Sequence, residues 1–167
     1  MKQATIHLMY GFIGFGKTTI AKKLAKETPA VRLCIDDFNV KLFGRNPYSD
    51  GFGNYIELNK ELIWNIAKET IESGIDVIID SGGVSNLKRR HDELQRARAL
   101  TPNIVLHIIN CDMETAEERT LKRTADKNAI EITEQDFENA FKRFEPIQEG
   151  ELGGYKIIYH ENGKVAK

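Results

Sequence analysis

The run Gly-Phe-Ile-Gly-Phe-Gly-Lys-Thr at residues 11–18 is the clearest sign of chemistry in the sequence. It fits the pattern G-x-x-x-x-G-K-[ST], in which glycines let the backbone curve until successive N–H groups point at one anion. In this pattern Lys17 reaches the β- and γ-phosphates of a nucleotide, and the Thr18 hydroxyl binds Mg²⁺. An apolar segment precedes the run and an amphipathic one follows it, as a phosphate site at a helix N-terminus requires. We therefore expect ATP and Mg²⁺ as cofactors.

The expected nucleotide contacts lie in this loop and at the start of the helix that follows. They are Gly11, Phe12, Ile13, Gly14, Phe15, Gly16, Lys17, Thr18 and Thr19. Guanine-specific proteins usually carry an Asn-Lys-x-Asp motif late in the fold, whereas the Asn-Lys-Glu-Leu run at 59–62 lacks the acid. The sequence therefore favours ATP over GTP.

Two carboxylates follow apolar runs that are typical of strands. Asp36 comes directly after residues 31–35, and Asp80 comes directly after residues 77–79. The carboxyl ends of parallel strands form the crevice in which such sheets bind ligands. There Asp36 would accept a proton from a hydroxyl or hold Mg²⁺ through water, and Asp80 would lie next to the metal as in a Walker-B strand. The expected metal-binding residues are Thr18, Asp36 and Asp80.

Both acids also have a purely structural interpretation. Asp36 or its neighbour Asp37 would serve as the N-cap of a helix starting near Phe38. For Asp37 this capping role is supported at least as well as a functional role. Asp80 would equally well open the Ser-Gly-Gly turn at 81–83.

Two arginines, Arg119 and Arg123, are one helical turn apart and face the same side. Such a pair would close over phosphates and offset the charge that develops on a transferred phosphoryl group. The alternative is a solvated helix face in which the arginines pair with Glu117, Glu118 and Asp126. Spacing alone favours this alternative, since charged helix faces are common.

The elements that must position these residues alternate along the chain between strand-like and helix-like patterns, which is typical of an α/β fold with a parallel sheet. The expected strands are 5–10, 31–35, 76–79, 104–110 and 155–159. The expected helices are 17–27, 57–73, 86–100, 115–124 and 134–144. Residues 44–54 are expected to form a loop. The sequence thus predicts a single domain over residues 1–167.

Composition excludes several other classes of protein. Of 167 residues, 41% are hydrophobic and 29% charged, and the formal net charge is −1, so no global positive field attracts nucleic acid or anionic membrane. The apolar runs are too short for a membrane span, and the N-terminus lacks the form of a signal peptide. The two cysteines fit no zinc spacing. We expect a cytoplasmic protein without membrane contact.

The chain resembles the small P-loop kinases and AAA-type ATP-binding proteins, a family that includes the kinase domain of polynucleotide kinase, zeta toxins and chloramphenicol phosphotransferase. The resemblance spans most of the chain. It rests on the run 11–18, on Asp36-Asp37, on Asp80 with Arg89 or Arg90 following, and on the pair Arg119 and Arg123.

The resemblance implies a P-loop NTPase three-layer α/β fold, in which a five-stranded parallel sheet is flanked by helices and covered by a helical lid. It implies that Asp36 is the base acting on the acceptor hydroxyl and that Arg119 and Arg123 form the lid. With Lys17, these three residues make up the expected catalytic set. Residues 141–146 resemble a segment found near the end of some family members, so Arg143 is expected to face the nucleotide.

These expectations describe a kinase that moves the γ-phosphate of ATP to a hydroxyl of an acceptor, with a small molecule favoured. The loop 43–55, which contains Arg45 and Tyr48, would supply acceptor contacts, or it is a plain surface loop. One alternative function is an ATPase switch that acts through a protein partner. Another is a kinase for nucleic-acid 5′ ends, although polynucleotide kinases carry an arginine soon after the paired acids and residues 38–41 contain none.

Overall fold

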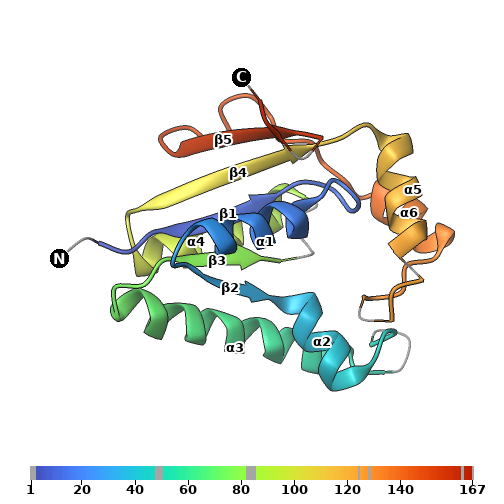
Figure 1. Cartoon of the computed structure of the whole chain (residues 1–167), viewed down its shortest axis with the longest axis horizontal. Coiled ribbons are helices and arrows are strands. Elements are labelled where there is room, and N and C mark those ends of the chain that lie inside the picture. The colour runs from blue at the N-terminus through green and yellow to red at the C-terminus, as the bar shows by residue number, and fades with distance from the viewer. Residues whose placement is uncertain are drawn as a thin grey trace.

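The computed structural model describes residues 3–47, 51–81, 86–123, 125–127, 129–162 and 164–166. It shows a central sheet with helices on both faces (Figure 1). The strands are β1 (Ile6–Tyr10), β2 (Val31–Cys34), β3 (Val77–Asp80), β4 (Ile104–Asn110), β5 (Lys156–Glu161) and β6 (Lys164–Val165). The helices are α1 (Lys17–Glu27), α2 (Ile35–Phe43), α3 (Gly53–Glu72), α4 (Leu87–Leu100), α5 (Met113–Arg123) and α6 (Glu134–Phe141). The expected α/β class is confirmed.

The strand order in the sheet is β2-β3-β1-β4-β5-β6. The first five strands pair in parallel, and β6 pairs with β5 antiparallel. The prediction of five strands therefore missed β6. That strand has only two residues and returns directly from β5 through a turn with Asn162 at a φ of 49°, so it is too short to show an apolar periodicity.

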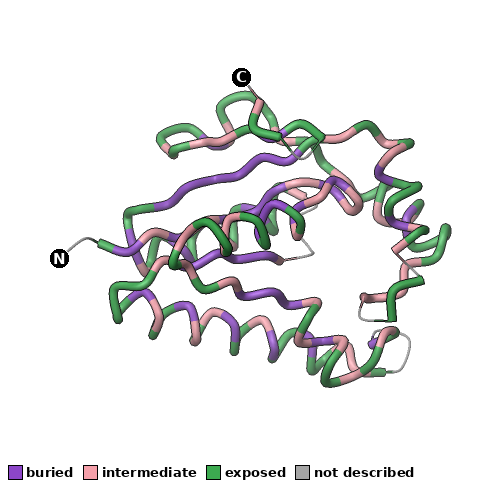
Figure 2. The backbone as a smooth tube through the Cα atoms, viewed as in Figure 1, coloured by how far each residue is buried: buried purple, intermediate pink, exposed green. Residues whose placement is uncertain are grey.

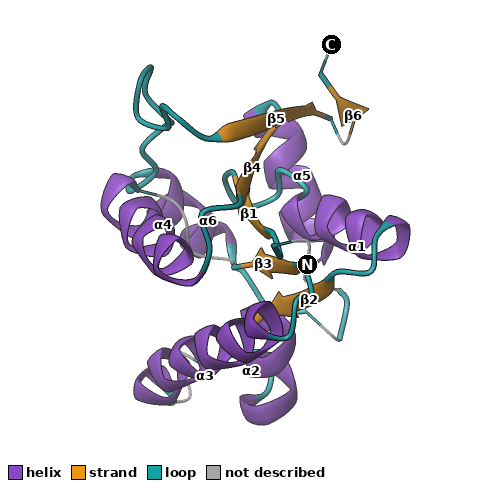
Figure 3. Ribbon diagram, turned by 90° about the vertical axis from the view of Figure 1, so that its left-hand side faces the viewer, coloured by secondary structure: helices purple, strands orange, loops and turns teal. Residues whose placement is uncertain are grey.

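The sheet is buried because successive residues of its strands point to opposite faces and both faces are covered. Leu8 packs with α3 and α4 residues such as Ile63 and Leu94, whereas Met9 packs with Ile20 of α1 and with residues of α5 and α6. Figure 3 shows α1 and α5 on one side of the sheet and α3 and α4 on the other. The buried residues accordingly follow the central strands and the inner sides of the helices (Figure 2).

Several boundaries differ from those expected. Ile35 begins α2 instead of ending β2, because Ile35 and Asn39, one helical turn apart, are buried together. A helix start near Phe38 was therefore wrong, and Asp36 and Asp37 lie in the first turn of α2. The predicted loop at 44–54 ends early, since α3 begins at Gly53.

The last helix, α6, is shorter at its C-terminal end than the predicted 134–144. Its start is fixed by a reciprocal capping box between Thr133 and Asp136, and it ends at Phe141. Among the described residues, no helix combines the length and apolar character needed to cross a membrane.

Candidate active site

The glycine-rich loop joins β1 to α1 at the carboxyl edge of the sheet, where it curves around the N-terminus of the helix. Gly14 has a φ of 78° and Gly16 a φ of 101°, both in a region that residues with a Cβ rarely adopt. A Cβ on Gly14 would lie 2.1 Å from the carbonyl oxygen of Ala116, so this position also lets the loop contact α5. The loop is thus shaped both for an anion and for close packing with the helix that carries Arg119 and Arg123.

Lys17 is buried within the loop that it follows, with 7% of its surface exposed. Its Nζ donates to the carbonyl oxygens of Gly11 and Phe12, each at 2.8 Å. Burial lowers the pKa of Lys17 to about 8, and the nearby charges of Asp80 and Asp36 partly oppose that shift. The loop therefore holds a desolvated cation at the edge of the cleft.

The two phenylalanines of the loop are anchored in an aromatic cluster with the last helix and the segment after it. The Phe12 ring lies 5.4 Å from Phe137 and 4.8 Å from Phe144, measured between centroids, and Phe15 lies 6.2 Å from Phe144. Both loop side chains are buried. Any contact of Phe12 and Phe15 with a nucleotide would therefore come from their backbone, while their rings pack against α6 and the segment after it.

Asp80 ends β3 and is almost fully buried, with 2% of its surface exposed. Its Oδ1 accepts a hydrogen bond from the Thr18 hydroxyl at 3.2 Å. Its Oδ2 accepts one from Nε of Arg32 at 3.0 Å. The structure therefore brings together the Thr18 and Asp80 side chains that the sequence nominated for Mg²⁺, and it adds an arginine that sequence reasoning did not single out.

Asp36 lies in the first turn of α2. Burial raises the pKa of Asp36, and the charges of Arg123 and Lys17 lower it, so these cations are its electrostatic neighbours. The predicted capping role of Asp37 is wrong, because the N-cap residue of α2 is Cys34, and no side-chain hydrogen bond caps this end of the helix. The Asp37 carboxylate instead lies 2.9 Å from Arg32 Nη1.

Both arginines of α5 line the same cleft as Lys17 and Asp36. Arg119 is exposed, and its Nη1 donates to the Cys111 sulfur at 3.4 Å. Glu118 forms an ion pair with Lys122. The hydrogen bond and charge of Lys122, and then the charge of Arg119, lower the pKa of Glu118, so this exposed carboxylate interacts with both cations.

The cleft has a volume of about 1220 Å³. All of the expected site residues except Phe15 line this cleft: Gly11, Phe12, Ile13, Gly14, Gly16, Lys17, Thr18, Thr19, Asp36, Asp80, Arg119, Arg123 and Arg143. Its wall also includes Arg45, Lys60, Asn86 and Arg89, which come from the other helices and their connections. Residues spread over most of the sequence thus converge on one cavity.

The connection after α2 meets the connection after α5 across this cleft (Figure 1). Arg45 Nε donates to the Ala129 carbonyl oxygen at 3.2 Å, the Glu131 backbone N–H donates to the Arg45 carbonyl oxygen at 3.1 Å, and Asn46 donates to the Glu131 carboxylate at 3.1 Å. Arg45 of the expected acceptor loop therefore lies on the cleft wall. Tyr48, named with it, lies outside the described residues.

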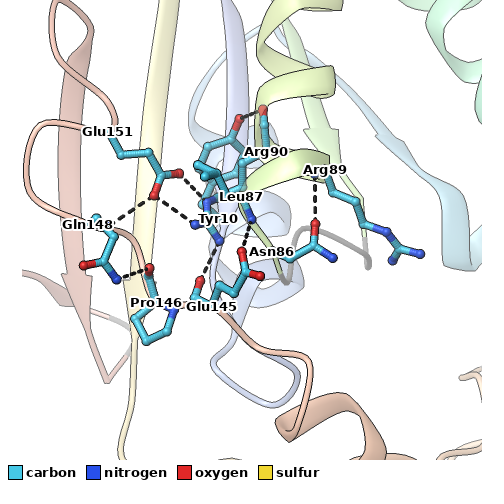
Figure 4. Close-up of polar contacts among 9 residues, drawn as sticks. All are labelled: Tyr10, Asn86, Leu87, Arg89, Arg90, Glu145, Pro146, Gln148 and Glu151. Atoms are coloured by element: carbon cyan, nitrogen blue, oxygen red, sulfur yellow. Dashed lines mark hydrogen bonds and ion pairs between the residues drawn. The ribbon is translucent and has the colours of Figure 1, made fainter.

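The pair Arg89 and Arg90 divides between two roles. Arg90 is buried, and its guanidinium binds both carboxylate oxygens of Glu151, at 2.5 and 2.9 Å, and the Glu145 carbonyl oxygen at 2.7 Å. Arg89 points away from this group, as Figure 4 shows, and lines the cleft. Arg90 is thus a structural arginine that attaches α4 to the segment before β5.

The donor set fits Mg²⁺, which prefers oxygen ligands and usually takes only one or two carboxylates besides waters and substrate phosphates. Thr18 and Asp80 present a hydroxyl and a carboxylate oxygen side by side, with Asp36 on the same cleft. The described residues include no group of three or more His, Cys, Asp or Glu side chains that could hold a metal. A metal at this place would therefore need oxygens from the nucleotide.

A family model described as an AAA domain matches residues 6–147, which include the loop, both carboxylates and the α5 arginines. The chain belongs to this AAA domain family. No curated protein matches its sequence.

Solved structures share the fold of this AAA domain at low sequence identity. A presumed kinase from Chloroflexus aurantiacus superposes with a TM-score of 0.73 at 18% identity, over 96% of this chain and 89% of that one. A chain of the Pnkp1/Rnl/Hen1 RNA repair complex gives 0.72 at 21% identity, over 92% of this chain and 51% of that one. A sugar kinase from Janibacter gives 0.60 at 18% identity, over 96% and 86%. The P-loop three-layer fold that the family resemblance implied is thereby confirmed.

Proposed function

We propose that this AAA domain protein is a kinase that transfers the γ-phosphoryl group of ATP to a hydroxyl group of a small acceptor. The observation that carries the proposal is the convergence, in one cleft, of a phosphate-binding loop, the half-buried carboxylate of Asp36 and two arginines. A switch ATPase would use the same loop and arginines, but the group beside them would orient a water instead of an acceptor hydroxyl. A kinase needs all three, because the acceptor oxygen must lose a proton while charge develops on the phosphoryl group.

In the proposed reaction the acceptor hydroxyl approaches Asp36, which takes its proton. The acceptor oxygen bonds to the γ-phosphorus as the bond from that phosphorus to the β–γ bridging oxygen breaks, and ADP leaves. Lys17 binds phosphate oxygens, and Arg119 and Arg123 offset the charge on the transferred group. Mg²⁺, held by Thr18 and Asp80, would supply further charge neutralisation at the phosphates. The raised pKa of Asp36 makes it a stronger base than an ordinary aspartate.

The acceptor side of the cleft supports a ligand that carries negative charge beside its hydroxyl. Arg45, Lys60 and Arg89 line that wall from three different segments of the chain. A sugar acid or a sugar phosphate bound there would lie close to these three positive charges. The 5′ end of a nucleic acid is the second candidate, supported by the same cations and by the structural similarity to a chain of the RNA repair complex.

The function is tested by ADP release from Mg·ATP in the presence of neutral sugars, sugar acids, sugar phosphates and 5′-hydroxyl oligonucleotides. Acceleration by one class identifies the acceptor. Slow release that no acceptor changes would contradict the kinase and support an ATPase that acts through a partner.

The role of Asp36 is tested with Asp36→Asn, for which we expect phosphoryl transfer to fall about 10²- to 10⁴-fold while ATP affinity changes little. The amide keeps the shape of the side chain but cannot take the proton. The matched control is Asp37→Asn, since Asp37 is the adjacent residue and its carboxylate is half exposed. Transfer at the normal rate in Asp36→Asn would remove Asp36 as the base.

A further inference from the structure

Arg32 is a charged residue on β2 that does not line the cleft itself but reaches Asp80, which does. The register of the parallel pair places Cys34 of β2 beside Asp80 of β3. Arg32 is two residues before Cys34, so the two side chains leave the same face of the strand. The long guanidinium side chain therefore runs forward along β2 and ends at Asp80, with only 15% of its surface exposed.

The contacts divide the two oxygens of the Asp80 carboxylate between two partners. Oδ2 lies 3.0 Å from Arg32 Nε and 2.9 Å from Nη2, and only the Nε–H is aligned as a hydrogen bond, so Nη2 acts on the carboxylate through its charge. Oδ1 faces the Thr18 hydroxyl at 3.2 Å. A carboxylate held on both sides in this way cannot rotate freely.

We propose that Arg32 is the positioning residue of the metal site, which fixes the Asp80 carboxylate through Oδ2 so that Oδ1 stays beside Thr18 for Mg²⁺. The inference rests on the proposed Mg²⁺ and ATP site. Arg32 does not line the cleft that the nucleotide loop and the acceptor residues form. Its proposed role at the metal site can be tested separately from any contribution to stability.

The contact between Arg32 and Asp37 does not account for the positioning role of Arg32. Arg32 Nη1 lies 2.9 Å from an Asp37 oxygen, but the Asp37 side chain is 48% exposed, and exposed ion pairs contribute little. Asp80 is 2% exposed, and removing the partner of a buried charge has large effects. The consequence of losing Arg32 should therefore appear at Asp80.

The test measures the affinity of a methylanthraniloyl-labelled ATP by fluorescence, once in excess MgCl₂ and once in EDTA. The ratio of the two affinities is the gain due to Mg²⁺. In Arg32→Gln we expect this gain to fall at least tenfold, with binding in EDTA within about threefold of the parent protein. Arg32→Lys keeps one positive charge but loses the planar guanidinium group, so it should lose part of the gain due to Mg²⁺. This variant replaces Arg32→Gln in the test if Arg32→Gln does not fold.

Arg90→Gln is the matched control, because Arg90 is a more deeply buried arginine that binds the Glu151 carboxylate and does not line the cleft (Figure 4). It should lower the unfolding temperature and leave the Mg²⁺ gain intact. An unchanged gain in both Arg32 variants, or an equal loss in Arg90→Gln, would overturn the positioning role and leave the proposed kinase standing. No Mg²⁺ gain in the parent protein would instead overturn the proposed function itself, and the inference with it.

Discussion

At the scale of single residues, the site is assembled from charges that the fold has removed from water. Lys17 is a buried cation bonded to two backbone carbonyls, Asp80 is a buried anion bonded to Arg32 and Thr18, and Asp36 is a carboxyl whose pKa burial raises. Buried charges cost stability unless they are paired, and they interact more strongly with a ligand than exposed charges do. The ligand-free protein thus carries a cost that a polyanionic nucleotide would relieve.

Replacing Lys17 by Met tests this cost. Burial lowers the pKa of Lys17 to about 8, so the folded state disfavours its charged form at neutral pH relative to the unfolded chain. We expect the free energy of unfolding of ligand-free Lys17→Met to stay the same or to rise by up to about 3 kcal/mol, while ATP binding is lost. Urea unfolding at pH 7 measures the first effect and nucleotide titration the second.

The exposed Lys26, on the same helix, provides the control: Lys26→Met should change neither quantity. A loss of more than about 1 kcal/mol in Lys17→Met would mean that the two carbonyl contacts outweigh the burial of the charge.

At the scale of elements, the nucleotide loop is fastened to the helices that lie over the site. Gly14 contacts the backbone of α5, and the rings of Phe12 and Phe15 pack against residues of α6 and the segment after it. Because α5 carries Arg119 and Arg123, the position of the loop and the position of the arginines depend on each other. A substitution that changes how the loop packs should therefore move the two arginines, even though it does not contact them.

Gly14→Ala is the element-level prediction. The added Cβ would lie 2.1 Å from the Ala116 carbonyl oxygen and must move the loop away from α5. We expect a loss of stability of about 1–3 kcal/mol and at least a tenfold loss of ATP affinity, measured by thermal unfolding and nucleotide titration.

Gly74→Ala separates the clash from backbone strain, because Gly74 has the same φ of 78° but no atom within 4 Å of an added Cβ. It should lose some stability and keep ATP affinity. Equal affinity losses in the two variants would show that contact with α5 is not the cause.

At the scale of the whole molecule, three histidines form a chain across the sheet. His7 Nδ1 lies 3.0 Å from His107 Nε2, and His107 Nδ1 lies 2.9 Å from His160 Nε2, which links β1, β4 and β5. Burial first, and then the neighbouring His7 and His160, lower the pKa of His107 to about 3. Burial also lowers the pKa of His160. The folded sheet therefore favours neutral imidazoles.

The stability of the protein should consequently fall in acid. Below the unfolded-state pKa of about 6.5 the unfolded chain binds a proton that folded His107 does not, so unfolding is favoured as the pH falls. From His107 alone we expect a loss on the order of 2 kcal/mol between pH 7 and pH 5, measured by urea unfolding. His107→Gln should flatten this dependence, whereas His91→Gln, at an exposed position on α4, should not. An unchanged slope in His107→Gln would assign the acid sensitivity to other groups.

The sequence alone was sufficient for the phosphate loop, the α/β class, the parallel sheet and the approximate limits of most elements. These depend on local information: the glycine spacing, the apolar periodicity and the alternation of strand and helix patterns. The two-residue β6 and the start of α2 at Ile35 were not readable, since the first has no periodicity and the second depends on burial against other elements.

Only the tertiary structure decided which charged residues belong to the site. Arg32 lies 48 residues from Asp80 in sequence, and in a strand pattern it is indistinguishable from a solvent-facing charge. Arg89 and Arg90 are adjacent and alike in sequence, yet one lines the cleft and the other is buried against Glu151. Sequence fixes residue types and their local spacing, whereas the pairing of buried charges depends on strand register and helix rotation, which arise only when the distant segments pack together.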